Sequence, residues 1–172
     1  MPPPEDRRRI DRLVVEHLPA ALRLARRLTG SGDAAEDLVQ EAMRRVLDRW
    51  QTYRGDASFK TWLLRIVINA DRDRRRRLRP IELYADDETA TPNPEPDQQA
   101  TANELANQIG AAIDSLPDRQ RETALLFFDE GLTADEVART LETTTSNVHA
   151  CLYQARKKIA AAIGYEPVRP RT

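Results

Sequence analysis

Apolar residues recur at helical spacing through the first part of the chain. They come every three or four positions between residues 10 and 30, until the glycines of "TGSGD" break the pattern. A second helix is predicted from Asp33, which has capping-box spacing with Glu36, to about Trp50. These residues therefore predict two packed helices. Their inward positions are Leu13, Leu18, Ala21, Leu22, Ala25 and Leu28 in the first, and Leu38, Ala42 and Val46 in the second.

The third predicted helix joins an apolar run directly to a block of arginines. It follows the loop "QTYRGDAS", contains "WLLRIVINADRDRRRRLRP" and ends at Pro80, because proline cannot continue a helix. Helical periodicity places apolar side chains on one face and an arginine stripe with one asparagine on the other. The apolar face holds Leu63, Ile66, Val67 and Ala70, and the stripe holds Arg65, Asn69, Arg72 and Arg76.

Such a stripe suits a phosphate backbone together with a single base-edge contact. The alternative is that Arg72 to Arg77 only solvate the end of the helix and interact favourably with its dipole. Periodicity by itself leaves both interpretations open.

The second half of the chain has the spacing of a helix-turn-helix. Thr133 and Glu136 form a capping-box signature before a short helix, and Thr144 can cap a longer helix that begins near Thr145. This is the geometry that offers a second helix to a DNA major groove, with plain helix-hairpin packing as the alternative. The inward residues are Val137, Ala138 and Leu141, then Val148, Leu152, Ala155 and Ile159, whereas Ser146, Ala150, Tyr153, Gln154 and Lys157 face outward.

Between the two halves lies a segment rich in Pro, Thr and acidic residues without an apolar period. Such a composition buries too little surface to offset the entropy of ordering, so residues 80–100 are predicted to be a flexible linker. We therefore predict an all-α protein of two small helical domains, residues 8–79 and residues 101–164.

Charge and composition narrow the class of protein. The formal net charge is −1, but residues 1–80 carry 19 Lys and Arg against 12 Asp and Glu, which suggests a basic module that meets a polyanion. No apolar stretch approaches the length of a membrane span, and the N-terminus lacks the apolar core of a signal peptide, so we expect a cytoplasmic protein. One cysteine and two distant histidines predict no metal site, and we expect neither a cofactor nor catalysis.

Two segments resemble a known family in the right order. Residues 10–79, which include "DLVQEA" and "RGDASFKTWLLRIVIN", resemble region 2 of bacterial sigma factors of the extracytoplasmic-function (ECF) group in the sigma-70 family. Residues 105–160, with "LPDRQRETALLFFDEGLTADEVARTLETTTSNVHACLYQARKKI", resemble region 4 of the same family. The resemblance implies a non-enzymatic subunit that binds core RNA polymerase, through the clamp helices of the largest subunit and the flap of the beta subunit. It also implies recognition of promoter DNA through two separated elements, and control by an anti-sigma factor.

The resemblance assigns roles to particular residues of region 2. "DLVQEA" implies that Asp37, Gln40 and Glu41 contact the polymerase clamp, and these residues share one face of a helix. The loop Tyr53 to Phe59, together with Asn69, would hold a flipped base of the minus-10 strand, supported by Arg65, Arg72 and Arg76. Trp62 and Phe59 are expected to belong to the core.

In region 4 the resemblance is weaker. The expected minus-35 contacts are Ser146, Asn147, His149, Ala150, Gln154 and Lys157, and cations appear only from Arg156 onward. Each missing phosphate contact removes roughly one unit of salt dependence, so we expect weak minus-35 binding or an unusual target sequence. Gln154 and Asn147 could pair with adenine. Glu142 stands where relatives commonly place a glycine, so either this residue is left-handed or the turn differs.

Two further functions remain open on the sequence. A helix-turn-helix regulator that dimerises through its N-terminal bundle would bind a duplex palindrome without polymerase. An adaptor that keeps the polymerase-docking face but has lost strong DNA reading would fit the cation-poor recognition helix.

Overall fold

The computed structural model describes residues 4–78 and 102–165. Every regular element in these two ranges is helical, which confirms the predicted all-α class. The predicted linker at residues 80–100 and the predicted helix end at Pro80 lie outside the described residues.

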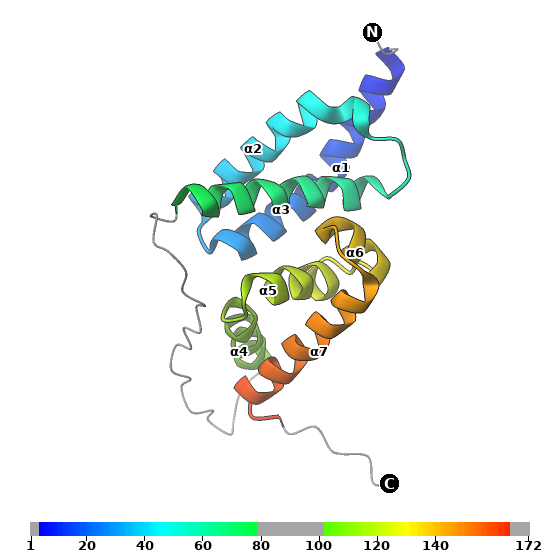
Figure 1. The fold of residues 1–172 in the computed structure, drawn as a ribbon. Coiled ribbons are helices and arrows are strands. Elements are labelled where there is room, and N and C mark those ends of the chain that lie inside the picture. The colour runs from blue at the N-terminus through cyan, green and yellow to red at the C-terminus, as the bar shows by residue number, and fades with distance from the viewer. Residues whose placement is uncertain (1–3, 79–101, 166–172) are drawn as a thin grey trace.

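Three helices form the N-terminal unit, as α1 (Pro4–Thr29), α2 (Gly32–Arg49) and α3 (Phe59–Leu78) pack against one another (Figure 1). Their apolar faces meet in a core that fully buries Leu24, Val46, Leu63 and Val67. The turn between α1 and α2 passes through Gly30, whose φ of 68° is a conformation that glycine adopts without a steric cost.

The start of α2 differs from the sequence prediction. Asp33 was expected to begin the helix in a capping box with Glu36, but the N-cap is Ser31. Ser31 has an extended backbone, and its hydroxyl accepts a hydrogen bond from the Ala34 amide at 3.5 Å. Asp33 lies in the first turn, where its charge favours the positive end of the helix dipole.

The C-terminal unit consists of α4 (Ala102–Asp114), α5 (Asp118–Ala124), the π-helical segment η2 (Leu125–Asp129), α6 (Ala134–Leu141) and α7 (Thr145–Ala162). The last two helices are the predicted helix-turn-helix. Thr133 and Glu136 form the expected capping box, and the Thr144 hydroxyl accepts a bond from the Asn147 amide at 3.2 Å. Of the four residues predicted to face inward on α7, Val148, Leu152 and Ala155 are buried, and Ile159 is half-buried against the same core.

The turn between α6 and α7 is left-handed at Glu142, with φ 53° and ψ 51°. It is the one residue other than glycine with a positive φ among those that the structure describes. The amides of Glu142 and Thr143 both bond to the carbonyl of Ala138, so the turn closes α6 as a glycine would, and the first of the two expected possibilities holds.

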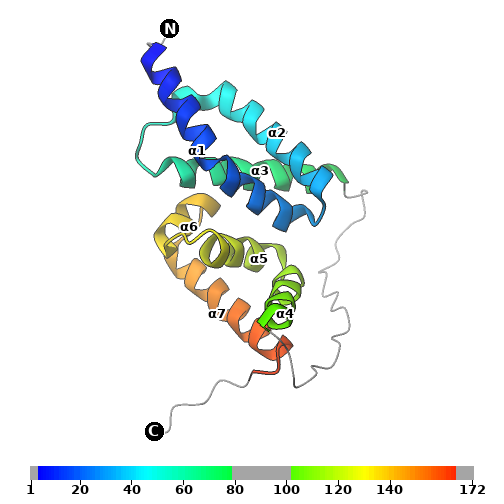
Figure 2. The ribbon, with the colours of Figure 1, turned by 180° about the vertical axis from the view of Figure 1, so that it is seen from behind.

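The two units are packed together. Helix α3 lies beside α6 (Figures 1 and 2). Helix α1 contacts η2. Leu64 and Ile68 are fully buried although they lie outside the apolar face predicted for α3. Because they share a side of the helix with Arg72 and Arg75, which contact the second unit, α3 is buried on two sides.

Candidate nucleic-acid interface

The loop before α3 is held in place by short-range contacts. It begins with the 3-10 turn η1 (Trp50–Thr52), and the Tyr53 hydroxyl donates to the carbonyl of Ala57 at 3.2 Å. The Ser58 hydroxyl accepts a hydrogen bond from the Thr61 amide at 3.1 Å, as an N-cap does. The loop is therefore anchored at both ends.

Aromatic rings fix the loop against the helix. The ring centroid of Phe59 lies 5.3 Å from that of Tyr53 and 5.4 Å from that of Trp62. Phe59 and Trp62 are buried, so the expectation that they belong to the core is confirmed. Packed aromatics of this kind make a rigid base for a binding loop.

A cavity of about 330 Å³ opens between this loop and α3. Residues 52–57 form one wall, Thr61, Trp62 and Arg65 form the other, and Arg139 of α6 reaches its edge. Its size and mixed polar and apolar lining suit one nucleobase. Asn69, which the sequence paired with the loop, is half-buried one turn beyond Arg65 and does not line the cavity.

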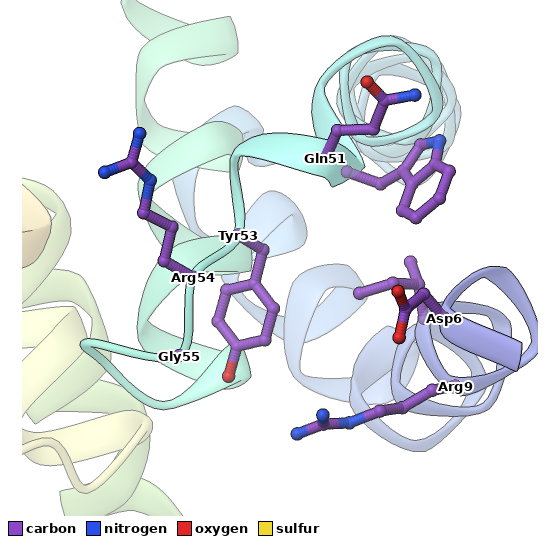
Figure 3. Close-up of a pocket in the computed structure, with 8 residues that line it drawn as sticks. Asp6, Arg9, Gln51, Tyr53, Arg54 and Gly55 are labelled. Atoms are coloured by element: carbon purple, nitrogen blue, oxygen red, sulfur yellow. The ribbon is translucent and has the colours of Figure 1, made fainter. Parts of the chain in front are cut away.

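A second cavity of about 290 Å³ lies on the other side of the loop (Figure 3). Asp6 and Arg9 of α1 face Gln51 and Tyr53 across it. Sequence reasoning missed Arg9 and Asp6 because they lie more than forty positions before the loop, and only the crossing of α1 brings them there.

The arginines of α3 differ in how strongly they are engaged. Arg76 is 75% exposed and bonds to Asp73 at 3.0 Å, whereas Arg65 is 40% exposed with Glu142 of the second unit at 4.0 Å. Arg72 makes two hydrogen bonds to Glu122 of α5, at 3.2 and 2.6 Å. Part of the predicted stripe therefore faces carboxylates.

Arg75, which sequence reasoning did not single out, is the most heavily paired arginine of α3. Its guanidinium contacts Asp71 at 2.9 Å, Asp118 at 2.5 Å and Glu122 at 2.6 Å. Burial acts to lower the pKa of Arg75, but the charge of Asp71 and the bond to Glu122 outweigh it, so this pKa lies above its usual value.

The three residues predicted to dock on polymerase lie together on α2. Asp37 and Gln40 are exposed, and Leu38 and Ala42 behind them are buried. Glu41 is partly covered because Arg45 donates to it at 2.9 Å. That hydrogen bond lowers the pKa of Glu41, because it favours the charged carboxylate.

The predicted reading face of α7 is accessible. It consists of exposed residues throughout, namely Ser146, Asn147, His149, Ala150, Gln154 and Lys157. Tyr153 on the same face is 65% exposed. Arg156 is engaged elsewhere, since its guanidinium lies over the rings of Phe127 and Phe128 at 5.9 and 5.6 Å. Fewer cations are thus available to phosphate than the sequence suggested.

The described residues were compared with the requirements of a metal site and of a membrane-spanning helix. No group of three or more His, Cys, Asp or Glu side chains there could hold a metal ion. None of the described helices combines the length and apolarity needed to cross a membrane. A helix-turn-helix, an arginine-bearing helix and a base-sized cavity together define a nucleic-acid-binding protein of the helix-turn-helix class.

Comparison with known proteins identifies the family. The sigma-70 region 2 family model matches residues 13–81, and the sigma-70 region 4 model matches residues 106–159. The ECF sigma factor SigE of Mycolicibacterium smegmatis is 35% identical over 153 residues, covering 87% of this chain and 59% of the relative. SigM of Mycobacterium tuberculosis is 31% identical over 166 residues, covering 93% of this chain and 80% of the relative. The chain therefore belongs to the sigma-70 family, in its ECF group.

The fold agrees with a solved member. The sigma factor RpoE of Bartonella quintana, determined in complex with the anti-sigma factor NepR, superposes with a TM-score of 0.70 at 20% identity. The match covers 91% of this chain and 98% of that one, so both helical units take part in it.

Proposed function

We propose that this protein binds core RNA polymerase and directs it to promoters, reading the minus-10 element as single-stranded DNA with region 2 and the minus-35 element as duplex with region 4. The observation that carries this function is the base-sized cavity beside the arginines of α3, in a chain that matches both sigma regions.

In region 2, the flipped minus-10 base enters the cavity between residues 52–57 and α3. Thr61 and Arg65 offer it polar contacts, and the aromatic ring of Trp62 forms part of the wall. Asn69 contacts the neighbouring nucleotide one helical turn along, and Arg72 and Arg76 bind phosphates. This assignment moves the base pocket from Asn69 to Arg65 relative to the sequence interpretation.

The remaining contacts divide between polymerase and duplex DNA. Asp37, Gln40 and Glu41 dock on the clamp helices of the largest subunit, and region 4 rests on the beta-subunit flap. The exposed α7 residues read the minus-35 element, with Asn147 and Gln154 as candidates for adenine. An anti-sigma factor is a further expected partner, because the sigma factor RpoE of Bartonella quintana, which shares this fold, was solved in complex with the anti-sigma factor NepR.

Transcription in vitro tests the function. Purified protein and bacterial core polymerase are incubated with fragmented genomic DNA, and the 5′ ends of the transcripts are sequenced. We expect start sites that share two spaced upstream elements. Arg65→Ala and Asn69→Ala should reduce initiation, whereas Arg49→Ala, which replaces an exposed arginine on α2, should leave it unchanged.

The same assay discriminates the two other functions. Polymerase binding without new start sites would favour an adaptor, which the scarcity of free cations on α7 would explain. Binding to duplex DNA without polymerase would instead favour a conventional regulator.

A further inference from the structure

Ion pairs connect region 2 to region 4 across the whole contact between them. The acids of region 4 that take part are called the acidic face here and comprise Asp118, Glu122, Glu130 and Glu142. Their partners in region 2 are Arg23, Lys60, Arg65, Arg72 and Arg75. Arg27 adds contacts to Asp114 and Asp129 at the edge.

Glu122 lies at the centre of this contact. Its side chain is only 3% exposed, and it accepts hydrogen bonds from Arg72 and, at 2.6 Å, from Arg75. A buried carboxylate is costly unless cations or donors surround it. Both arginines belong to α3. The carboxylate of Glu122 therefore has its hydrogen-bond donors only while regions 2 and 4 are in contact.

Glu130 repeats this arrangement elsewhere in the contact. Its side chain is 1% exposed, with Arg23 at 3.0 Å and Lys60 at 3.4 Å. Lys60 also donates to the backbone carbonyl of Glu130. Two separate buried acids therefore depend on cations from the other region.

The acidic face pairs with two arginines to which the proposed function assigns contacts with DNA. Arg65 and Arg72 would contact the minus-10 strand, yet here they face Glu142 and Glu122. A carboxylate and a phosphate satisfy an arginine in the same way, through parallel hydrogen bonds to the guanidinium fork. Arg139 of α6 also borders the base-sized cavity.

Region 4 covers the proposed DNA contacts of region 2 but leaves its own proposed DNA contacts exposed. The α7 residues proposed for the minus-35 element, such as Ser146, His149 and Gln154, are exposed in the same arrangement. Figure 1 shows why, because α7 runs away from region 2 while α6 lies beside α3. Duplex DNA could reach region 4 at a stage when region 2 is still covered.

We propose that region 4 is an intramolecular competitor of the promoter strand. In the free protein its acidic face holds the cations of α3, and the two regions must separate before single-stranded minus-10 DNA binds. This inference rests on the proposed function, which identifies the competing strand as minus-10 promoter DNA. By thermodynamic linkage, a single strand that binds region 2 must itself favour separation.

Two measurements on the full chain test this competition without polymerase. The radius of gyration is obtained by small-angle X-ray scattering, and affinity is obtained from the fluorescence anisotropy of a labelled pool of random single-stranded DNA. The Glu122→Gln/Glu130→Gln double variant removes both buried charges and keeps their shape. We expect a larger radius of gyration and about tenfold tighter DNA binding than in the wild type.

Glu16→Gln/Glu36→Gln is the matched control, since it makes the same two chemical changes at exposed sites on α1 and α2. It should change neither measurement. Circular dichroism confirms that the double variant remains helical. If it does not, a salt series on the wild-type chain replaces it, because added salt weakens ion pairs and should expand the closed form.

Each contrary result has a distinct meaning. A radius that changes with neither the substitutions nor salt overturns the role of the acidic face in holding the two regions together. Expansion without tighter DNA binding overturns the competition. Neither readout uses polymerase or a promoter, so the failure of promoter-directed initiation would refute the proposed function and leave the closed state standing.

Discussion

At the scale of single residues, Glu142 carries an identifiable backbone cost. A left-handed conformation costs a residue with a Cβ roughly 1 kcal/mol, and glycine avoids it. The Glu142 side chain offsets little of this free-energy cost, because its contact with Arg65 is at 4.0 Å and both side chains are well exposed. The turn of the helix-turn-helix therefore places Glu142 in a backbone conformation that this residue type disfavours.

Glu142→Gly should consequently stabilise the protein by about 0.5–1 kcal/mol, since the positive φ remains and the steric cost is removed. Urea denaturation followed by circular dichroism measures the change. Glu142→Ala is the control, because it deletes the same carboxylate but keeps a Cβ, and it should give no gain. Equal effects of Gly and Ala would mean that the carboxylate, and not the backbone, determines stability here.

Arg45 acts at the same scale by joining two helices. Its guanidinium bonds to Glu41 of α2 at 2.9 Å and to Asp73 of α3 at 2.8 Å. The hydrogen bond from Arg45 is the main cause that lowers the pKa of Asp73, as it does for Glu41. A carboxyl group whose pKa is lower in the folded state stabilises the fold above its unfolded pKa and loses that contribution as the pH falls through the folded value.

Arg45→Met should therefore lower Tm at neutral pH, and the difference from the wild type should shrink as the pH falls below about 4, where unfolded Asp and Glu titrate. Thermal unfolding by circular dichroism between neutral and strongly acidic pH measures this. Arg49→Met, at an exposed position of the same helix, should show a small effect that does not depend on pH. A constant difference for Arg45→Met would contradict an ionic role.

At the scale of elements, α3 is the helix on which the molecule is organised. One side packs against α1 and α2, and another packs against α6. Its buried residues therefore extend well beyond one apolar stripe and include Thr61 and Asp71. Asp71 is tolerated there because Arg74 and Arg75 both contact it.

Leu64→Ala tests the second buried side of α3. Leu64 is fully buried, so its truncation should cost about 2–5 kcal/mol in chemical denaturation, as large-to-small changes in cores do. Leu78→Ala removes the same group at a position that is 67% exposed and should cost less than about 0.5 kcal/mol. A small effect of Leu64→Ala would mean that this side of α3 is not closely packed in solution.

At the scale of the whole molecule, the contact between the two regions contains many charged residues. Arginine and lysine on region 2 meet aspartate and glutamate on region 4, and apolar residues such as Leu64 and Ile68 lie beside them. An interface of this kind responds to salt far more than the core of either region, because the hydrophobic contribution is not screened.

Calorimetry at two salt concentrations should detect this difference. At about 0.05 M salt the ion pairs couple the two regions, and we expect one unfolding transition. At about 0.5 M salt the more exposed pairs are screened and the coupling weakens, so the regions should unfold in two separate transitions. A number of transitions that does not change with salt would show that the interface is held by its apolar residues and by its buried ion pairs, which salt screens much less.

The sequence by itself predicted the all-α class, the family and the helices α1, α2, α3, α6 and α7, but it did not predict α4, α5 or η2 as separate elements. Helical spacing, the Thr133 capping box and the Thr144 cap are local signals, since each depends on residues within a few positions of one another. For the same reason the exposed faces of α2 and α7 could be predicted directly from the sequence. The failure at Asp33 was also local, because Ser31 provides an equivalent cap two residues earlier.

Only the tertiary structure decided which arginines of α3 are engaged and what shapes the base-sized cavity. Arg72 and Glu122 are fifty positions apart, and Arg65 and Arg139 meet only because α6 packs beside α3. Periodicity predicts the direction in which a side chain points from its own helix, but it does not predict which charged group of another helix lies opposite that side chain. The arginine stripe that suggested DNA from the sequence is, for that physical reason, partly occupied by the protein's own acids.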